Sequence, residues 1–147
     1  MTITPEALRD AARHMVETVP QASALGFKLI SVEPSRGSIF TPWREELVGD
    51  HDTGVIAGGV ITALLDHVCG LAVTSRSLEG GFLSTATLDL RIDYMRPAAP
   101  RADVTASAHC YKLTRNIAFV RAHAFDADPE DPIATAQAAF VLKRAAP

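Results

Sequence analysis

The chain has 147 residues, the length of one ordinary domain. Hydrophobic residues make up 48% of it and charged residues 21%, which excludes a disordered chain and fits a packed globular protein. The net charge of −3 lacks the basic excess that nucleic-acid partners select. We therefore expect a single domain over residues 1–147 that does not bind nucleic acid.

The first twenty residues predict a helix rather than a signal peptide, because no basic region precedes an apolar run. Thr4 suits the N-cap and Pro5 the first helical position, and Pro20 is expected to end the helix. Apolar residues at spacings of three and four predict an amphipathic helix over about residues 5–18. Its buried face would carry Leu8, Ala11, Met15 and Val19.

Without a secretory signal, we expect a cytoplasmic protein in which Cys69 and Cys110 are reduced packing residues. Two cysteines at this separation do not make a metal site, and no metal is predicted. The longest hydrophobic stretch, residues 55–73, contains Thr62, Asp66 and His67. Because a lipid-spanning helix avoids such residues, no membrane association is expected.

Residues 25–32 and 37–41 predict two strands around a turn at residues 34–37, followed by an irregular segment over residues 42–54. Residues 58–76 lack proline and predict a helix. Apolar residues cover most of its circumference, so other structure must wrap around it.

After Gly80 and Gly81 the pattern changes to period two. Residues 86–94 predict a half-buried strand, and further strands are expected at about residues 103–113, 116–126 and 133–143. Short turns between these strands indicate antiparallel pairing. The fold class is therefore α+β: one curved antiparallel sheet around one hydrophobic helix. A doubly wound parallel sheet is excluded because helices do not alternate with the later strands.

Asp66 is the main candidate for chemistry, because it lies on an otherwise apolar helix. Thr62, Asp66, Gly70 and Thr74 recur every four residues and form one stripe of polar or small residues. A carboxylate in apolar surroundings needs hydrogen-bond donors or a catalytic role; the alternative is an exposed edge or a loop cap.

Gly58 and Gly59 begin the same helix, whose N-terminus presents unpaired N–H groups. Such groups can bind an oxyanion or a thioester carbonyl oxygen. The alternative is a simple turn from loop to helix.

The pattern of these residues resembles the PaaI-like (phenylacetate-pathway type) branch of the hotdog-fold acyl-CoA thioesterases. Gly54, the Gly58–Gly59 pair and Asp66 carry the resemblance, together with the later segments Thr87-x-Asp89 and Tyr94-x-x-Pro97. It covers about residues 22–143 and implies a hotdog core there. It also implies a homodimer, or a dimer of dimers (a homotetramer), with active sites between subunits.

The resemblance implies hydrolysis of an acyl-CoA to the free acid and CoA, with no cofactor apart from the CoA of the substrate. Asp66 of the partner subunit would activate water or attack the carbonyl carbon, and Thr87 would position the water or Asp66. The N–H of Gly58 would bind the carbonyl oxygen, assisted by Gly59 and His51.

Two positions depart from the family pattern. Ala57 stands where the family has histidine, and His51 stands where it usually has asparagine. Exposed basic residues near turns are expected to bind the CoA phosphates, the alternative being ordinary surface charge. They are Arg96, Lys112 and Arg115.

Two other functions stay open on the sequence. His51 and Asp66 resemble, in order and separation, the histidine and acid of hotdog enzymes that dehydrate or isomerise 3-hydroxyacyl thioesters. The loss of the family histidine at Ala57 also leaves a non-catalytic acyl-CoA-binding protein. The acyl group is not predicted.

Overall fold

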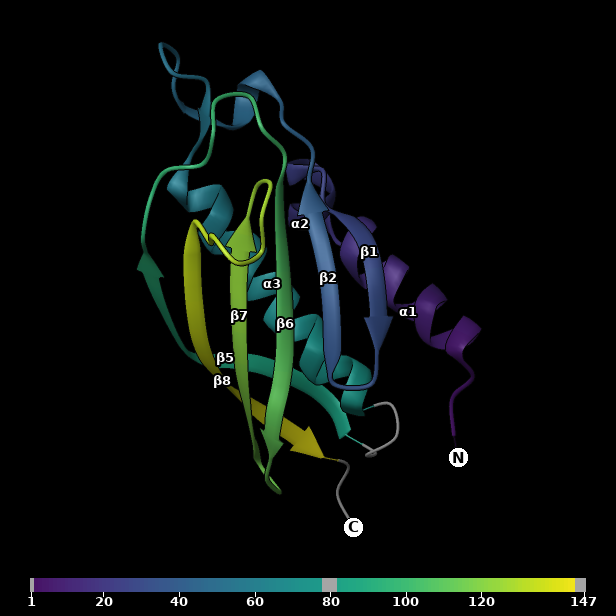
Figure 1. The fold of residues 1–147 in the computed structure, drawn as a ribbon. Coiled ribbons are helices and arrows are strands. Elements are labelled where there is room, and N and C mark those ends of the chain that lie inside the picture. Colours follow the sequence, from purple (N-terminus) through teal and green to yellow (C-terminus); the bar gives the residue numbers. More distant parts are fainter. Residues whose placement is uncertain (1, 78–81, 145–147) are drawn as a thin grey trace.

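In the computed structural model, which describes residues 2–77 and 82–144, one six-stranded sheet wraps around a long helix (Figure 1). Every neighbouring pair of strands is antiparallel. The strands, in their order across the sheet, are β1 (Lys28–Glu33), β2 (Arg36–Thr41), β6 (Val104–Leu113), β7 (Ile117–Phe125), β8 (Ala134–Arg144) and β5 (Phe82–Tyr94). The predicted fold class is confirmed. Gly80 and Gly81, where the sequence pattern changes, lie outside the described residues.

The wrapped element is α3 (Gly58–Ser77), close to the predicted helix over residues 58–76. It packs against β6, β2, β7 and β5. Length and composition would also allow it to cross a membrane, but here it is the core helix. Leu64, Leu65 and Val68 are fully buried.

The inner face of the sheet is rich in alanine, which lets α3 approach the strands closely. Buried residues alternate along β6, β7 and β8, as expected for strands with one face on the core. The buried alanines of these strands are Ala106, Ala108, Ala118, Ala122, Ala124, Ala134, Ala136 and Ala138.

The N-terminal helix α1 (Pro5–Glu17) forms as predicted, with the Thr4 hydroxyl accepting from the Ala7 N–H at 3.2 Å. Its buried face is different: Leu8 is buried as expected, but Ala12 and Val16 replace Ala11 and Val19. The buried residues recur every four positions, and Val19, expected on the buried face, is exposed after the end of α1.

Pro20 does not only end a helix, because it also begins a second one, α2 (Pro20–Leu25). Proline suits the first helical position, where no intrahelical N–H bond is lost. Gly26 ends α2 with a left-handed φ of 77°. The first strand therefore starts at Lys28 rather than at residue 25.

The β1–β2 hairpin crosses close to the C-terminal half of α3 at Gly37. A Cβ atom on Gly37 would lie 2.7 Å from the Leu71 side chain, so a larger residue there would displace Leu71 from the core. The segment predicted to be irregular contains a short 3-10 helix, η1 (Glu45–Leu47), and a small hairpin. The hairpin consists of β3 (Val48–Asp50) and β4 (Val55–Ile56) and leads into α3.

Candidate functional site

Asp66 lies on the side of α3 that faces β5. Its Oδ1 accepts a hydrogen bond from the Thr87 hydroxyl at 2.7 Å. Asp66 is half-buried and Thr87 is exposed. The two residues expected to act together from the sequence are therefore in direct contact, on neighbouring elements separated by 21 residues in the chain.

A β-bulge at Leu88 makes this contact possible. Thr87 pairs with Phe140 and Asp89 with Ala139, so β5 has one extra residue opposite two consecutive residues of β8. Successive strand residues alternate in direction, and a bulge shifts this alternation by one. Thr87 and Tyr94, seven positions apart, consequently both point to α3.

Because of the bulge, the predicted alternation of buried and exposed residues along β5 is wrong before Asp89. Leu90 and Ile92 pack against the core as expected. Ala86 and Leu88 were expected on the same face, but both are exposed, and Leu88 is 61% exposed. Without the bulge, Thr87 would point away from Asp66.

The first turn of α3 is fixed by two hydroxyl groups. The Gly58 carbonyl oxygen accepts from the Tyr94 hydroxyl at 2.8 Å and from the Thr62 hydroxyl at 3.0 Å, and these two hydroxyls are 2.5 Å apart. The sequence did not predict the contact between Tyr94 and Gly58. Tyr94 was noted only as part of the Tyr94-x-x-Pro97 segment of the family resemblance.

Gly58 and Gly59 are exposed at the N-terminus of α3. Among the described residues, no group accepts a hydrogen bond from either N–H, as expected for the first residues of a helix. Ala57 before them donates its N–H to the Leu47 carbonyl at 2.9 Å. A Cβ atom on Gly49 would approach Ala57 to 3.2 Å, so β3 packs tightly against this entry to the helix.

His51 is exposed in the turn between β3 and β4. Within the described part of the chain it makes no hydrogen bond to Asp66, Gly58 or Thr87. Figure 1 shows this hairpin extending beyond the sheet at the end where α3 begins. The structure therefore joins Asp66 to Thr87 and not to His51.

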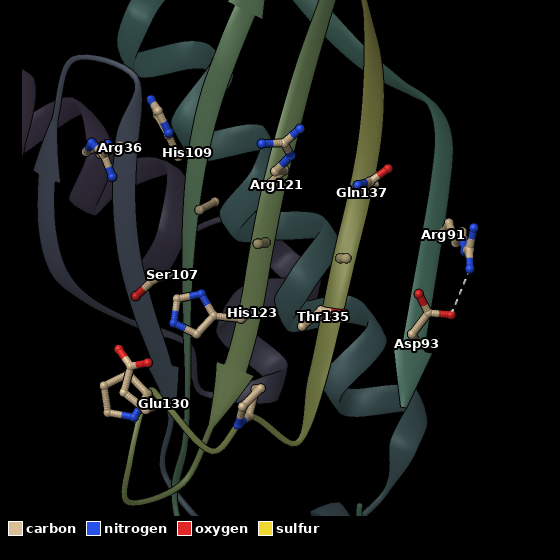
Figure 2. Close-up of a pocket in the computed structure, with 15 residues that line it drawn as sticks. Arg36, Arg91, Asp93, Ser107, His109, Arg121, His123, Glu130, Thr135 and Gln137 are labelled. Carbon is tan, nitrogen blue, oxygen red and sulfur yellow. Dashed lines mark hydrogen bonds and ion pairs between the residues drawn. The ribbon is translucent and has the colours of Figure 1, made fainter. Parts of the chain in front are cut away.

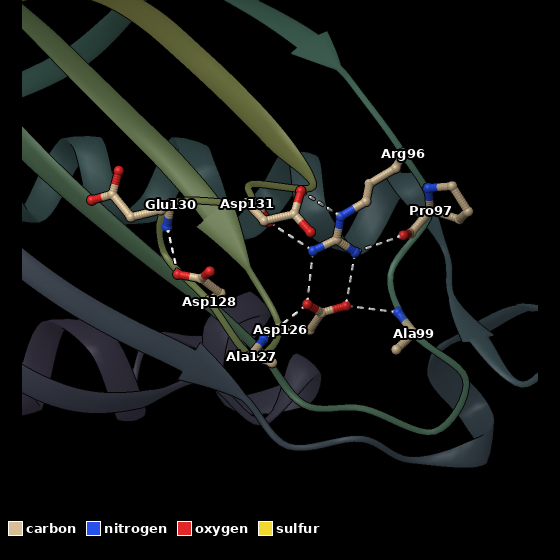
Figure 3. A network of polar contacts seen from close by, with 8 residues as sticks. All are labelled: Arg96, Pro97, Ala99, Asp126, Ala127, Asp128, Glu130 and Asp131. Carbon is tan, nitrogen blue, oxygen red and sulfur yellow. Dashed lines mark hydrogen bonds and ion pairs between the residues drawn. The ribbon is translucent and has the colours of Figure 1, made fainter.

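Arg96 has partners other than the expected phosphates (Figure 3). It forms a two-pronged ion pair with Asp126, at 2.9 and 3.0 Å, and also donates to the carbonyl oxygens of Asp131 and Pro97. Asp126 also accepts from the Ala99 N–H at 2.8 Å. The hydrogen bonds from Arg96 hold the pKa of the Asp126 carboxyl well below its usual range. This network argues against Arg96 as a phosphate ligand.

Lys112 and Arg115 are both exposed near the β6–β7 turn. That turn lies at the end of the sheet away from the first turn of α3 (Figure 1). In one subunit, these basic residues are therefore remote from Gly58.

Two further titratable residues, His67 and Cys69, lie within one turn of Asp66 on α3. Burial raises the pKa of the Cys69 thiol to about 12 and lowers the pKa of His67. The His67 Nε2 lies 3.1 Å from the Met15 carbonyl oxygen and joins α3 to α1. Over residues 2–77 and 82–144, no three His, Cys, Asp or Glu side chains gather as metal ligands would.

The family model of the thioesterase superfamily matches residues 53–133, which include α3 and β5. The chain belongs to the thioesterase superfamily. Human acyl-coenzyme A thioesterase 13 is 26% identical over 121 residues, covering 81% of this chain and 82% of that protein. A Halobacterium salinarum protein with an esterase name is 32% identical over 109 residues, covering 71% and 70%. The medium/long-chain acyl-CoA thioesterase YigI of Escherichia coli is 25% identical over 127 residues, covering 79% and 81%.

Solved structures of this superfamily share the fold. A crystal structure of a Pseudomonas aeruginosa protein has a TM-score of 0.81 and 35% identity, covering 91% of this chain and 98% of that one. The PaaI protein of the Escherichia coli phenylacetic acid degradation operon has a TM-score of 0.78 at 18% identity, covering 92% of both chains. The expected hotdog fold and family are confirmed, whereas the roles of individual site residues stay predictions.

Proposed function

We propose that this thioesterase-superfamily protein hydrolyses the thioester bond of an acyl-CoA, releasing the free acid and CoA. The observation that carries the proposal is the hydrogen bond from Thr87 to Asp66, which lies on the same helix as the exposed glycine pair Gly58–Gly59. The curated relatives named as acyl-CoA thioesterases support CoA as the thiol half of the substrate.

In this proposal the thioester carbonyl oxygen accepts hydrogen bonds from the N–H groups of Gly58 and Gly59. Negative charge develops on that oxygen as the carbonyl carbon becomes tetrahedral, and the positive end of α3 stabilises it. The hydroxyls of Tyr94 and Thr62 hold the Gly58 carbonyl, which keeps the first turn of the helix in place. Removing one donor of this kind typically slows turnover by about 10²–10³-fold.

Asp66 of a second copy of the chain supplies the carboxylate by one of two routes, since eight residues of helix, about 12 Å, separate Asp66 from Gly58 of its own chain. As a general base it takes a proton from water while the water oxygen attacks the carbonyl carbon; the carbon–sulfur bond then breaks and the CoA thiolate takes up a proton. As a nucleophile it attacks the carbonyl carbon itself and expels CoA, and water then hydrolyses the mixed anhydride. Neither route uses a metal or another cofactor.

We further propose that the site is completed by a second copy of the chain across β5. This strand is an edge of the sheet, 13 residues long, and carries Thr87 and Tyr94. Antiparallel pairing of two β5 edges would place the first residues of one β5 beside the last residues of the other. Lys112 and Arg115 lie at the end of the sheet where β5 begins, so the partner would bring them toward the α3 N-terminus, where they would bind CoA phosphates.

The dehydratase or isomerase alternative depends on a pair formed by His51 and Asp66. Since these residues make no contact in the described structure, no observation favours that alternative. A non-catalytic acyl-CoA-binding protein is distinguished by the experiment below.

The test is Asp66→Asn, which keeps the shape of the side chain and an oxygen that can accept from Thr87. We expect turnover of acyl-CoA to fall by about 10²–10⁴-fold, because the carboxylate is lost, while acyl-CoA binding is retained. A panel of short, medium, long and aryl acyl-CoAs, assayed for thiol release, provides the measurement. Asp10→Asn, at an exposed acid of α1, is the control.

Near-normal turnover by Asp66→Asn would reject the assigned role of Asp66. Tight binding of acyl-CoAs by the unmutated protein, with no thiol release across the whole panel, would instead support the non-catalytic alternative.

A further inference from the structure

The outer face of the sheet, on the side away from α3, has a cavity of about 830 Å³. Figure 2 shows charged and polar side chains of five strands projecting in front of the sheet, with α3 behind it. The cavity does not include Asp66, Thr87 or Gly58. Its volume lies within the range of small-molecule sites, roughly 300–1,000 Å³.

One line of residues crosses this cavity in register. Arg36 of β2 pairs with His109 of β6, which pairs with Arg121 of β7; Arg121 pairs with Gln137 of β8, which pairs with Arg91 of β5. Directly opposite side chains on one face of a sheet lie about 5 Å apart. We call these five residues the cationic row.

The cationic row contains three arginines and no carboxylate, with one neutral side chain between each arginine and the next. Arg36 and Arg91 each have an exposed acid nearby but off the row, Glu33 at 3.8 Å and Asp93 at 3.3 Å. Exposed pairs of this kind contribute little.

Arg121, at the centre of the row, has no described carboxylate within ion-pair distance. Its guanidinium instead lies over the Tyr111 ring, 4.1 Å from the ring centre. Burial, together with the charges of Arg36, Arg76 and Arg121, lowers the pKa of His109. His109 is thereby kept as a neutral hydrogen-bonding group beside two cations.

We propose that the cationic row binds a diphosphate group, as carried by nucleoside diphosphates and by coenzyme A. A guanidinium matches phosphate oxygens with two parallel hydrogen bonds, and the flexible side chains of the outer arginines can converge on a ligand held at Arg121. The neighbouring line of the cavity contains Ser107, His123, Thr135 and Asp93, which can form hydrogen bonds to a sugar or base. This site is separate from the proposed thioesterase site and does not depend on it.

The test is isothermal titration calorimetry of the intact protein with inorganic pyrophosphate, ADP and CoA, with inorganic phosphate for comparison. Arg121→Gln should weaken the binding of pyrophosphate and ADP by about tenfold or more, because a charge-assisted contact is lost. Arg9→Gln, at an exposed arginine of α1, should leave binding unchanged. If CoA also binds at the α3 N-terminus, Arg121→Gln removes one of its two binding events and leaves the other.

The two sources of the diphosphate are distinguished by affinity: tighter binding of ADP than of CoA identifies a nucleotide site, and the reverse identifies a CoA site. Acyl-CoA turnover and the melting temperature without ligand should stay close to those of the unmutated protein in Arg121→Gln, because the side chain lies on the outer face of the sheet. If that variant does not fold, Arg36→Gln carries the same expectation.

Three results would overturn the proposal. They are equal binding by Arg121→Gln and the unmutated protein, no binding of pyrophosphate, ADP or CoA at millimolar concentration, and a smaller mass in solution for Arg121→Gln. The last result would identify the face as a contact between copies of the chain.

Discussion

The Thr87 hydroxyl contacts Asp66 across two elements, and its contribution to catalysis can be separated from a contribution to folding. Thr87→Val removes the hydroxyl while keeping the branched shape, and Thr87→Ser restores it. Since a hydrogen bond to a charged group is typically worth about 1.5–3 kcal/mol, we expect kcat to fall about 10–100-fold in Thr87→Val, with KM nearly unchanged.

Steady-state kinetics on an acyl-CoA that the unmutated protein hydrolyses gives the measurement. Recovery of most of the rate in Thr87→Ser identifies a positioning role. A rise in KM without loss of kcat, or equal defects in both variants, would contradict it.

Asp66 and Gly58 could be singled out from the sequence because an acidic residue on an apolar helix and a glycine pair at its start are local signals, whereas Thr87 was named only through the family resemblance. Arg96 was misleading for the opposite reason. Its partner Asp126 is 30 residues away in the chain, and only the folded structure shows that the guanidinium is already occupied.

At the scale of elements, β5 is both part of the site and an unpaired edge. Leu88 is 61% exposed, Met95 is 58% exposed and Tyr94 is 49% exposed. A long edge strand with exposed apolar residues favours pairing with another chain. We therefore expect Leu88→Lys to weaken the proposed dimer and, with it, turnover. Ile30→Lys, on the opposite edge strand β1 with 52% exposure, should do neither.

Light scattering coupled to size exclusion gives the mass of each variant and separates a dimer from a dimer of dimers. An unchanged mass and activity in Leu88→Lys, or an equal loss in Ile30→Lys, would exclude β5 as the specific interface.

The strands and α3 could be predicted because their hydrophobic periods are long and regular. The bulge at Leu88 could not, because the apolar residues Ala86, Leu88 and Leu90 continue an uninterrupted period-two pattern. The buried face of α1 was displaced for a similar reason: adjacent alanines, Ala11 and Ala12, are equivalent in any hydropathy pattern. Bulges and helix rotation depend on contacts with β8 and α3, which local sequence does not encode.

At the scale of the whole molecule, the Arg96–Asp126 pair joins the connection after β5 to the connection after β7 (Figure 3). Asp126 is only 6% exposed and Arg96 is 29% exposed. These connections lie at the end of the sheet where α3 begins (Figure 1). The ion pair therefore holds the two connections together near the first turn of that helix.

Asp126→Asn should therefore reduce stability in a pH-dependent way. Because the pKa of Asp126 is lowered in the folded protein, its stabilisation is complete above the unfolded pKa of about 3.9 and is lost as the pH falls toward the folded value. We expect a loss of about 2 kcal/mol at pH 7, since a largely buried carboxylate leaves its cation unpaired. The difference from the unmutated protein should narrow below about pH 4. Urea unfolding at several pH values measures it, with Asp128→Asn on the same connection as the control. A constant difference from pH 7 to pH 3 would mean that the carboxylate charge is not what stabilises this end of the sheet.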